Sequence, residues 1–206
     1  MEEKNLQLER LVFFCDAVVA IAITLLAFNL KIEHTVDGHL RFTDIFNQWK
    51  VFAAFLLSFF NIANYWKAHH TFFVHIKKID EKMLWYNILW LLFIVLLPFS
   101  TTLVSTHFFD TPAIFIYSLN ILMIALFQNY IWDYASVKPE YLKDTIDKGT
   151  VYQIRLFCNL DMINGLIAIA VSFFFPAIAF LLLFTKLPLI IIARLFFKDA
   201  IRGGRK

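Results

Sequence analysis

Several common functional signatures are missing from this sequence. Glycine and proline occur only five times each among 206 residues, and neither a phosphate-binding glycine loop nor a nucleophile elbow is present. Enzyme chemistry therefore has little support. The two cysteines, Cys15 and Cys158, both fall in stretches predicted to span a membrane, which argues against a disulfide framework.

Charged residues are also scarce. They make up 17% of the chain, whereas 60% of the residues are hydrophobic, 18% are aromatic and the mean hydropathy is +0.68. These proportions lie outside the range of ordinary soluble domains and predict an integral membrane protein. The formal net charge of +3 does not indicate a nucleic-acid partner, because the basic residues are scattered between apolar segments and form no patch with interleaved aromatics.

Six apolar stretches are long enough to cross a bilayer, for which a helix needs about 20 mostly apolar residues. They are residues 13–31, 45–66, 83–104, 113–132, 151–173 and 177–197. The sequence therefore predicts an all-α, polytopic membrane protein with one six-helix domain over residues 1–206. Most Lys and Arg residues lie in the N-terminus, in the 67–82 and 133–155 connections and in the tail, so the positive-inside rule predicts that both termini are cytoplasmic.

The first span carries two stripes of different size, because residues three or four apart share a helix face. The bulky apolar stripe contains Phe14, Val18, Ile21, Leu25 and Phe28, and the small stripe contains Ala17, Ala20, Thr24 and Ala27. Such stripes usually pack, so that one meets lipid and the other meets a neighbouring helix. The alternative is that the bulky stripe, repeated around a symmetry axis, forms a hydrophobic constriction that gates ions by excluding water.

Polar residues are predicted to converge at the cytoplasmic end of several spans. The topology places in this layer Arg10, Asp16, Trp66, His69, His70, Asn87 and Arg155. Six residues correspond to about 240° of helical rotation, so Arg10 and Asp16 are not expected to pair with each other. Asp16 is instead expected to accept hydrogen bonds from a histidine, the Trp66 indole or an arginine of a neighbouring helix. A network that locks the bundle is favoured over direct ion coordination.

No metal site is expected in this layer. His69 and His70 are adjacent, so their side chains diverge by about 100° on a helix, and His75 follows. Apart from Asp80 and Glu81, no cysteine or carboxylate lies nearby at ligand spacing. A histidine here would still confer sensitivity to protons, because its unperturbed pKa is near 6.5.

Charges and a proline interrupt the apolar spans. Asp161 lies half-way along the fifth span and Lys186 half-way along the sixth, and antiparallel neighbours would bring them to similar depth. Because a single buried charge is costly, we predict that they pair, with Asn159 or Asn164 as further partners. Pro98 is predicted to break the third span, where the hydroxyls that follow it can satisfy freed carbonyl groups.

Familiar channel signatures are absent as well. There is no Thr-Val-Gly-Tyr-Gly filter, no helix with regularly spaced arginines, and only a tight turn around Pro176 where a pore loop would have to fit. The residues nevertheless carry a resemblance. Arg10, followed by Phe14-Cys15-Asp16 and by segment 20–26, is similar to the first-helix signature of the endosomal and lysosomal potassium channel family, transmembrane protein 175, whose pattern has Ser at the position of Cys15. The similarity continues through Trp66, His69, His70 and Phe73 and through Leu97-Pro98-Phe99.

The resemblance implies a potassium-permeable cation channel that needs no cofactor beyond the permeant potassium ions. Prokaryotic members of the family carry a single set of six helices and assemble as tetramers. A homotetramer in the lipid bilayer of a bacterial or archaeal cell membrane is therefore implied. Selectivity for potassium over sodium is expected to be modest, since no backbone carbonyl cage is encoded.

The resemblance also implies roles for residues of the first helix, which lines the pore in this family. Ile21 is implied to be the narrow hydrophobic point, with Leu25 and Phe28 further out and Thr24 as a nearby hydroxyl. The Arg10, Phe14 and Asp16 motif is implied to be a structural network near the cytoplasmic end.

Two other functions stay open. A secondary transporter, proton-coupled in one version, would use Asp161, Lys186 and the histidines as its relay. Turnover that saturates at transporter rates and is lost with Asp161→Asn would favour this function. A non-conducting membrane scaffold is the third, and the absence of any flux through the purified protein would favour it.

Overall fold

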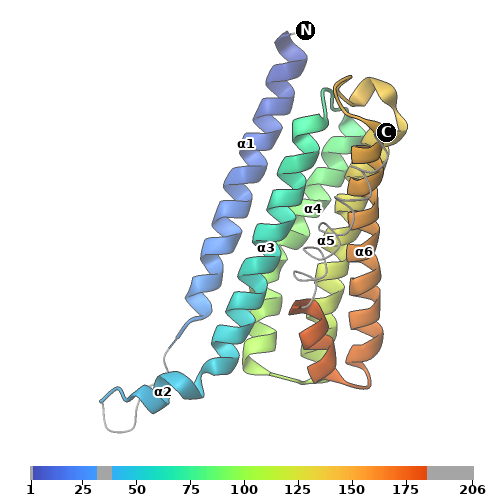
Figure 1. The fold of residues 1–206 in the computed structure, drawn as a ribbon. Coiled ribbons are helices and arrows are strands. Elements are labelled where there is room, and N and C mark those ends of the chain that lie inside the picture. Colours follow the sequence, from blue (N-terminus) through green and yellow to red (C-terminus); the bar gives the residue numbers. More distant parts are fainter. Residues whose placement is uncertain (1, 32–38, 185–206) are drawn as a thin grey trace, which may run out of the picture.

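The structure, a computed structural model that describes residues 2–31 and 39–184, is a bundle of long helices (Figure 1). In chain order the elements are α1 (Glu2–Leu25), the 3-10 helix η1 (Leu26–Asn29), α2 (Phe42–Asn47), α3 (Trp49–His75), α4 (Glu81–Thr106), α5 (Thr111–Val137), the 3-10 helix η2 (Pro139–Tyr141) and α6 (Lys148–Ser172). Residues 176–184 form a further helical stretch. The predicted all-α fold is confirmed.

Four segments in the described part of the chain are long and apolar enough to cross a membrane. They are Leu6–Asn29, Glu81–Thr106, Thr111–Val137 and Lys148–Ser172. Helix α3 is equally long, but Ser58, Asn61 and Asn64 interrupt its apolar residues. Six membrane spans therefore stay a prediction, since the second falls on α3 and the sixth, 177–197, continues outside the described residues.

Two predicted spans differ clearly from the helices. Helix α1 begins at Glu2, well before the predicted start at residue 13, because the Glu, Lys, Gln and Leu residues of its first turns are good helix formers. The predicted span 45–66 is divided. Helix α2 ends at Asn47, Gln48 departs from helical geometry with φ −91° and ψ 15°, and α3 then continues to His75.

The connections gather at two ends of the bundle (Figure 1). The start of α1 and residues 76–80 and 138–147 lie at one end, which we call the N-terminal end, and the turns at 107–110 and 173–175 lie at the other. The two positively charged connections therefore lie at the same end of the bundle as the start of α1, which is consistent with the topology predicted from the positive-inside rule. The cytoplasmic location of the N-terminal end stays a prediction.

The connection after α5 contains η2 and pairs with the connection after α3. The backbone N–H of Lys77 donates to the carbonyl of Tyr141 at 2.8 Å, and the N–H of Lys143 donates to the carbonyl of His75 at 2.9 Å. These two bonds flank an isolated antiparallel bridge between Ile76 and Leu142. They fix the start of α4 against the end of α5.

A polar cluster joins α3, α4 and α5 within the bundle. Ser58 Oγ lies 2.6 Å from Thr101 Oγ1 and 3.1 Å from Tyr117 Oη, and Asn61 Nδ2 donates to Tyr117 Oη at 3.3 Å. All four side chains are buried. Because lipid cannot satisfy polar groups, these bonds fix the relative depth of the three helices.

The predicted break at Pro98 is wrong, since α4 runs without interruption from Glu81 to Thr106 with Pro98 inside it. Hydroxyls on the following turn bond to the carbonyls of Leu97 and Pro98, whereas the carbonyl that Pro98 leaves without its helical N–H donor is that of Ile94. Ser100 and Thr101 donate to the carbonyl of Leu97 at 3.0 and 2.7 Å. Such local bonds allow a membrane helix to continue through a proline.

Candidate functional site

The apolar face of α1 that the sequence singles out is uncovered. Ile21, Leu25 and Phe28 are 60%, 40% and 72% exposed, and Thr24 on the adjoining stripe is exposed as well. Thr24 Oγ1 donates to the carbonyl of Ile21 at 2.8 Å, so its proton is used within the helix while its oxygen can still accept. The face is therefore apolar and carries one hydroxyl oxygen.

The small stripe of α1 is uncovered too, since Ala17, Ala20 and Ala27 are exposed. Within the described part of the chain, neither of the two predicted stripes is the main packing face. Helix α1 contacts α3 and α4, and the buried residues of α1 and the following η1 are Leu11, Cys15, Val19, Ala22 and Leu26. Sequence reasoning missed this third stripe, although its spacing of three and four residues was a signal. Both predicted stripes are thus available to lipid or to another copy.

Asp16 is held by α3. The indole Nε1–H of Trp66 donates to Asp16 Oδ1 at 2.8 Å, and the ring of His70 stacks on that of Trp66 with centroids 5.7 Å apart. Of the three donors expected for Asp16, the structure therefore has the Trp66 indole. The bond connects α1 to α3 about one and a half turns before Ile21 along α1.

His69, Asn87 and Cys15 form a second, buried set of contacts. His69 Nε2 lies 2.7 Å from Asn87 Oδ1, and Asn87 Nδ2 donates to Cys15 Sγ at 2.8 Å. Because Asn87 uses its oxygen toward His69, the histidine nitrogen must be the donor in that pair. The ring of His69 also stacks on Trp90 with centroids 4.3 Å apart. Cys15, His69 and Asn87 are all buried, so these contacts join α1, α3 and α4 inside the bundle.

Arg10 and Phe14 lie outside these contacts. Both are exposed, and Arg10 makes no hydrogen bond or ion pair with the residues that the structure describes. Arg155, expected in the same layer, instead binds α5, where its Nε donates to Asp133 Oδ1 and its Nη2 to Ser136 Oγ, each at 2.8 Å. The structure thus brings together Asp16, Trp66 and His70, and separately His69 and Asn87.

A contact that the sequence analysis missed holds the other end of the uncovered face. Thr102 Oγ1 donates to Asn29 Oδ1 at 2.9 Å, and Asn29 Nδ2 donates to the carbonyl of Pro98 at 3.4 Å. The 3-10 turn that carries Phe28 is therefore attached to α4 beside its proline.

Asp161 lines a small cavity between α3, α5 and α6. The cavity has a volume of about 50 Å³, and Asn64 and Gln128 line it as well. Gln128 Oε1 is buried without a hydrogen-bond partner in the described part of the chain. Since a water needs roughly 10–15 Å³, the cavity has room for water.

The predicted partners of Asp161 have different outcomes. Lys186 lies outside the described residues, so its pairing with Asp161 stays a prediction. Asn159 Oδ1 accepts from Asn129 Nδ2 at 2.9 Å, which links α5 to α6.

The described residues contain no group of three or more His, Cys, Asp or Glu side chains placed to hold a metal ion.

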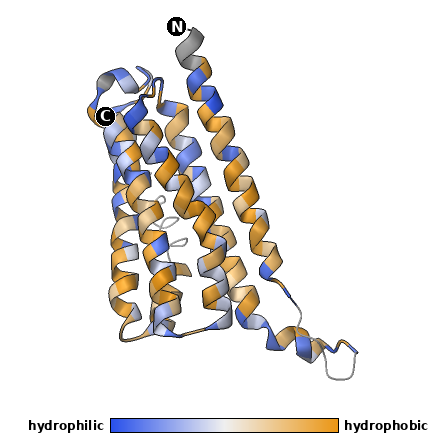
Figure 2. Ribbon diagram, turned by 180° about the vertical axis from the view of Figure 1, so that it is seen from behind, coloured by the Kyte–Doolittle hydropathy of each residue, from blue (hydrophilic) through white to orange (hydrophobic). Residues whose placement is uncertain are grey.

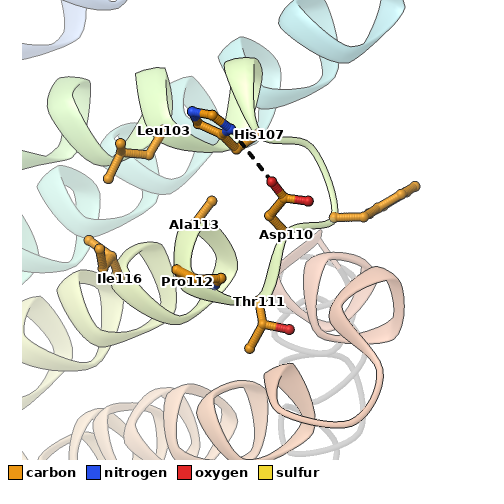
Figure 3. Close-up of a pocket in the computed structure, with 8 residues that line it drawn as sticks. Leu103, His107, Asp110, Thr111, Pro112, Ala113 and Ile116 are labelled. Atoms are coloured by element: carbon orange, nitrogen blue, oxygen red, sulfur yellow. Dashed lines mark ion pairs between the residues drawn. The ribbon is translucent and has the colours of Figure 1, made fainter.

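A larger hollow of about 560 Å³ opens at the turn between α4 and α5, at the end opposite to Asp16 (Figure 3). Its polar contact is between His107 Nδ1 and Asp110 Oδ2, 3.5 Å apart. Both side chains are more than half exposed, where an ion pair contributes little to stability. The hollow therefore has the character of a surface feature and not of a catalytic site.

Comparisons with known proteins decide the family. The family model described as "Endosomal/lysosomal potassium channel TMEM175" matches residues 10–98, which include most of α1, all of α3 and much of α4. The crystal structure of a lysosomal potassium-selective channel TMEM175 homolog from Chamaesiphon minutus resembles the chain with a TM-score of 0.79 and 27% identity, over 91% of this chain and 97% of that one. The chain belongs to the TMEM175 family.

Further TMEM175 relatives agree with this membership. A potassium channel of Chamaesiphon minutus is 29% identical over 80% of this chain and 83% of its own length, and one of a Chryseobacterium species is 27% identical over 82% and 85%. The mouse endosomal/lysosomal proton channel TMEM175 is 28% identical over all of this chain but only 43% of its own length. The chain thus corresponds to one repeat of about half the mammalian protein.

Proposed function

We propose that the protein is a potassium channel of the cell membrane whose pore is lined by α1. The observation that carries the proposal is the uncovered face of Ile21, Leu25 and Phe28, which are 60%, 40% and 72% exposed in the single chain. A face this apolar needs either lipid or other copies of itself to cover it. The relatives described as potassium channels favour the second.

The proposed assembly is a homotetramer around a central pore. Four copies of α1 would place the bulky stripes toward the axis, and the neighbouring stripe of small residues allows adjacent helices to approach closely. A mass in detergent that corresponds to four chains supports this arrangement. A monomer contradicts it, because one α1 cannot enclose a pore.

The proposed gate is a ring of Ile21 side chains. Such a constriction blocks ions by staying dry and conducts when it widens enough for water to enter. Thr24 lies about one turn away and offers a hydroxyl oxygen to a hydrated or partly dehydrated ion. Because no carbonyl filter is encoded, the proposed preference for potassium over sodium is modest.

The proposed role of the Asp16–Trp66 and His69–Asn87–Cys15 contacts is to hold α1 in place behind the pore. All of them lie on or near the face of α1 that meets α3 and α4. They are proposed as structural contacts and not as ion ligands, since His69 and Asn87 are buried inside the chain. Arg10 and Phe14, which are exposed, are proposed to contact a neighbouring copy.

Potassium flux into proteoliposomes tests the function. A channel predicts flux that rises with the potassium gradient without saturating at transporter rates. The second candidate, a proton-coupled transporter, rests on Asp161 in its polar cavity between α3, α5 and α6. Saturating turnover that Asp161→Asn abolishes would favour the transporter, and the absence of flux in either assay contradicts both.

A further inference from the structure

Helices α4 and α5 meet along a continuous surface, which we call the α4/α5 seam. On α4 it contains Lys82, Tyr86, Phe93, Leu96 and Ser100, and on α5 it contains Tyr134, Tyr130, Phe127, Met123 and Asn120. Steps of three, four and seven residues keep each set on one helix face. Ring contacts join the two faces, with centroids 5.6 Å apart for Tyr86 and Tyr130 and 5.7 Å apart for Phe93 and Phe127.

The far part of the seam contains an apolar hollow. It has a volume of about 350 Å³, and Phe93, Leu96, Leu119 and Met123 are among the side chains that line it. Its polar lining side chains are Ser100 and Asn120, which bond to each other at 3.2 Å. A hollow of this size and polarity suits a hydrocarbon chain.

The near part of the seam, at the N-terminal end of the bundle, carries three lysines over tyrosine rings. Lys82 Nζ lies 5.2 Å from the ring centroid of Tyr134, Lys138 Nζ lies 4.4 Å from the same centroid, and Lys78 Nζ lies 5.0 Å from that of Tyr141. Contact with an aromatic face stabilises an ammonium group without neutralising its charge. These lysines therefore remain able to bind an anion.

Asp80 is the carboxylate among these lysines, and it accepts hydrogen bonds from other donors. Asp80 Oδ2 accepts from the hydroxyls of Tyr134 and Tyr141 at 2.5 and 2.6 Å, and Asp80 Oδ1 accepts from the backbone N–H of Met83 at 2.9 Å. Glu81 and Glu140 are also nearby in the chain, and both are exposed to solvent. Asp80 thus orients the tyrosines on which the lysines rest.

The spacing between the two parts matches half a bilayer. Phe93 follows Lys82 by three helical turns, which is a rise of about 17 Å along α4. Half of the hydrocarbon core of a bilayer is about 15 Å thick. An acyl chain that starts beside the lysines therefore ends at the apolar hollow. Figure 2 shows hydrophilic residues gathered near the two ends of the bundle, the N-terminal end included, and mainly hydrophobic residues along the helices between them.

We propose that the α4/α5 seam binds an anionic phospholipid of the leaflet next to the N-terminal end of the bundle. Its phosphate lies among Lys78, Lys82 and Lys138, and one acyl chain follows Phe93 and Phe127 into the hollow. Charge complementarity at one end and the apolar hollow at the other select a lipid over a soluble anion.

Native mass spectrometry of the purified full-length protein tests the proposal. Dipalmitoyl phosphatidylglycerol is expected to bind more tightly than dipalmitoyl phosphatidylcholine. Lys78→Gln and Lys82→Gln are each expected to weaken binding about fivefold, since a basic residue near an anionic lipid contributes about that factor. Lys82→Arg keeps the charge and is expected to retain affinity. Lys148→Gln, an exposed lysine outside the seam, is the matched control.

A second variant tests the hollow. Leu96→Trp fills it and is expected to weaken binding of dipalmitoyl phosphatidylglycerol while leaving the weaker binding of dihexanoyl phosphatidylglycerol unchanged. Equal affinity for the two dipalmitoyl lipids, an equal effect of Lys148→Gln, or displacement of the lipid by glycerol phosphate would overturn the proposal. Efficient disulfide cross-linking between two copies of Leu96→Cys would also overturn it, because the seam would then be an interface between subunits.

Discussion

The indole of Trp66 and the carboxylate of Asp16 are joined by a hydrogen bond of 2.8 Å between Nε1 and Oδ1. The two residues are 50 positions apart in the sequence, on α3 and α1, and the bond joins these two helices. Ile21, Leu25 and Phe28 on the opposite side of the helix are exposed. The position of the proposed gate therefore depends on this pair.

Trp66→Phe is expected to destabilise the protein by about 1 kcal/mol, the net value of a typical hydrogen bond at a partly exposed site. The change removes the indole donor and keeps an aromatic ring over His70. Thermal unfolding in detergent measures the loss. Asp16→Asn keeps an acceptor oxygen and is expected to cost less, so a larger effect of Asp16→Asn would speak against the bond as the source of stability.

Asn87→Leu is expected to cost about 1–3 kcal/mol, because it leaves the buried Nε2–H of His69 without an acceptor. Asn87 is completely buried and bonds to both His69 and Cys15. Unfolding of Asn87→Leu, of His69→Phe and of the double variant gives the coupling between the two residues. Additive losses would show that the contact carries no energy.

The sequence predicted the helical class, the start and end of α4, α5 and α6 to within five residues, and the Trp66 indole as one of the possible donors to Asp16. It did not predict which face of α1 packs inside the chain, because every stripe of that helix contains apolar or small residues. In a lipid environment, hydropathy does not distinguish a face that meets a neighbouring helix from one that meets lipid or another copy.

The arrangement around Asp80 was also missed. Its side chain caps α4 and accepts from Tyr134 and Tyr141, which lie 54 and 61 residues further along the chain. Only the cap has a local signal, an aspartate three residues before the N–H that it binds. The two tyrosine contacts depend on how the 138–147 connection folds back, and no spacing in the sequence indicates that.

Stability at the N-terminal end is expected to fall at acid pH. Burial raises the pKa of Asp80, but the hydrogen bonds from Tyr134 and Tyr141 outweigh burial and lower the pKa below its usual value. A lowered pKa in the folded state means that the stabilisation is complete above the unfolded pKa of about 3.9 and is lost as the pH falls through the folded pKa.

Hydrogen exchange of the 138–147 connection measures this effect. The protection factors of its amides, which are the exchange rates corrected for the intrinsic rate at each pH, are expected to stay constant between neutral pH and about pH 5 and to fall below about pH 4. Asp80→Asn is expected to lower the protection factors at neutral pH and to remove their acid dependence. Unchanged acid dependence in Asp80→Asn would show that another group is responsible.

Gly165→Ala is expected to destabilise the contact of α5 with α6. A Cβ at Gly165 would lie 3.2 Å from both the Cα and the Cβ of Leu122, and the backbone atom cannot move aside without shifting α5. The expected cost is about 1–3 kcal/mol, as for overpacking in a core. Unfolding in detergent measures it, with Leu166→Ala, at a side chain that is 55% exposed, as the control. Equally small losses of stability in Gly165→Ala and Leu166→Ala would contradict the prediction, because they would mean that α5 and α6 accommodate the added Cβ by a small shift.

Potassium flux through reconstituted Ile21 variants tests the proposed pore most directly. Ile21→Asn places a polar side chain at the proposed constriction and is expected to raise resting flux on the order of tenfold, because water then enters the closed gate more readily. Phe13→Asn, at an exposed position outside the bulky stripe, is expected to leave flux unchanged. Equal flux through the native protein and Ile21→Asn, or an equal rise with Phe13→Asn, would contradict a gate at Ile21.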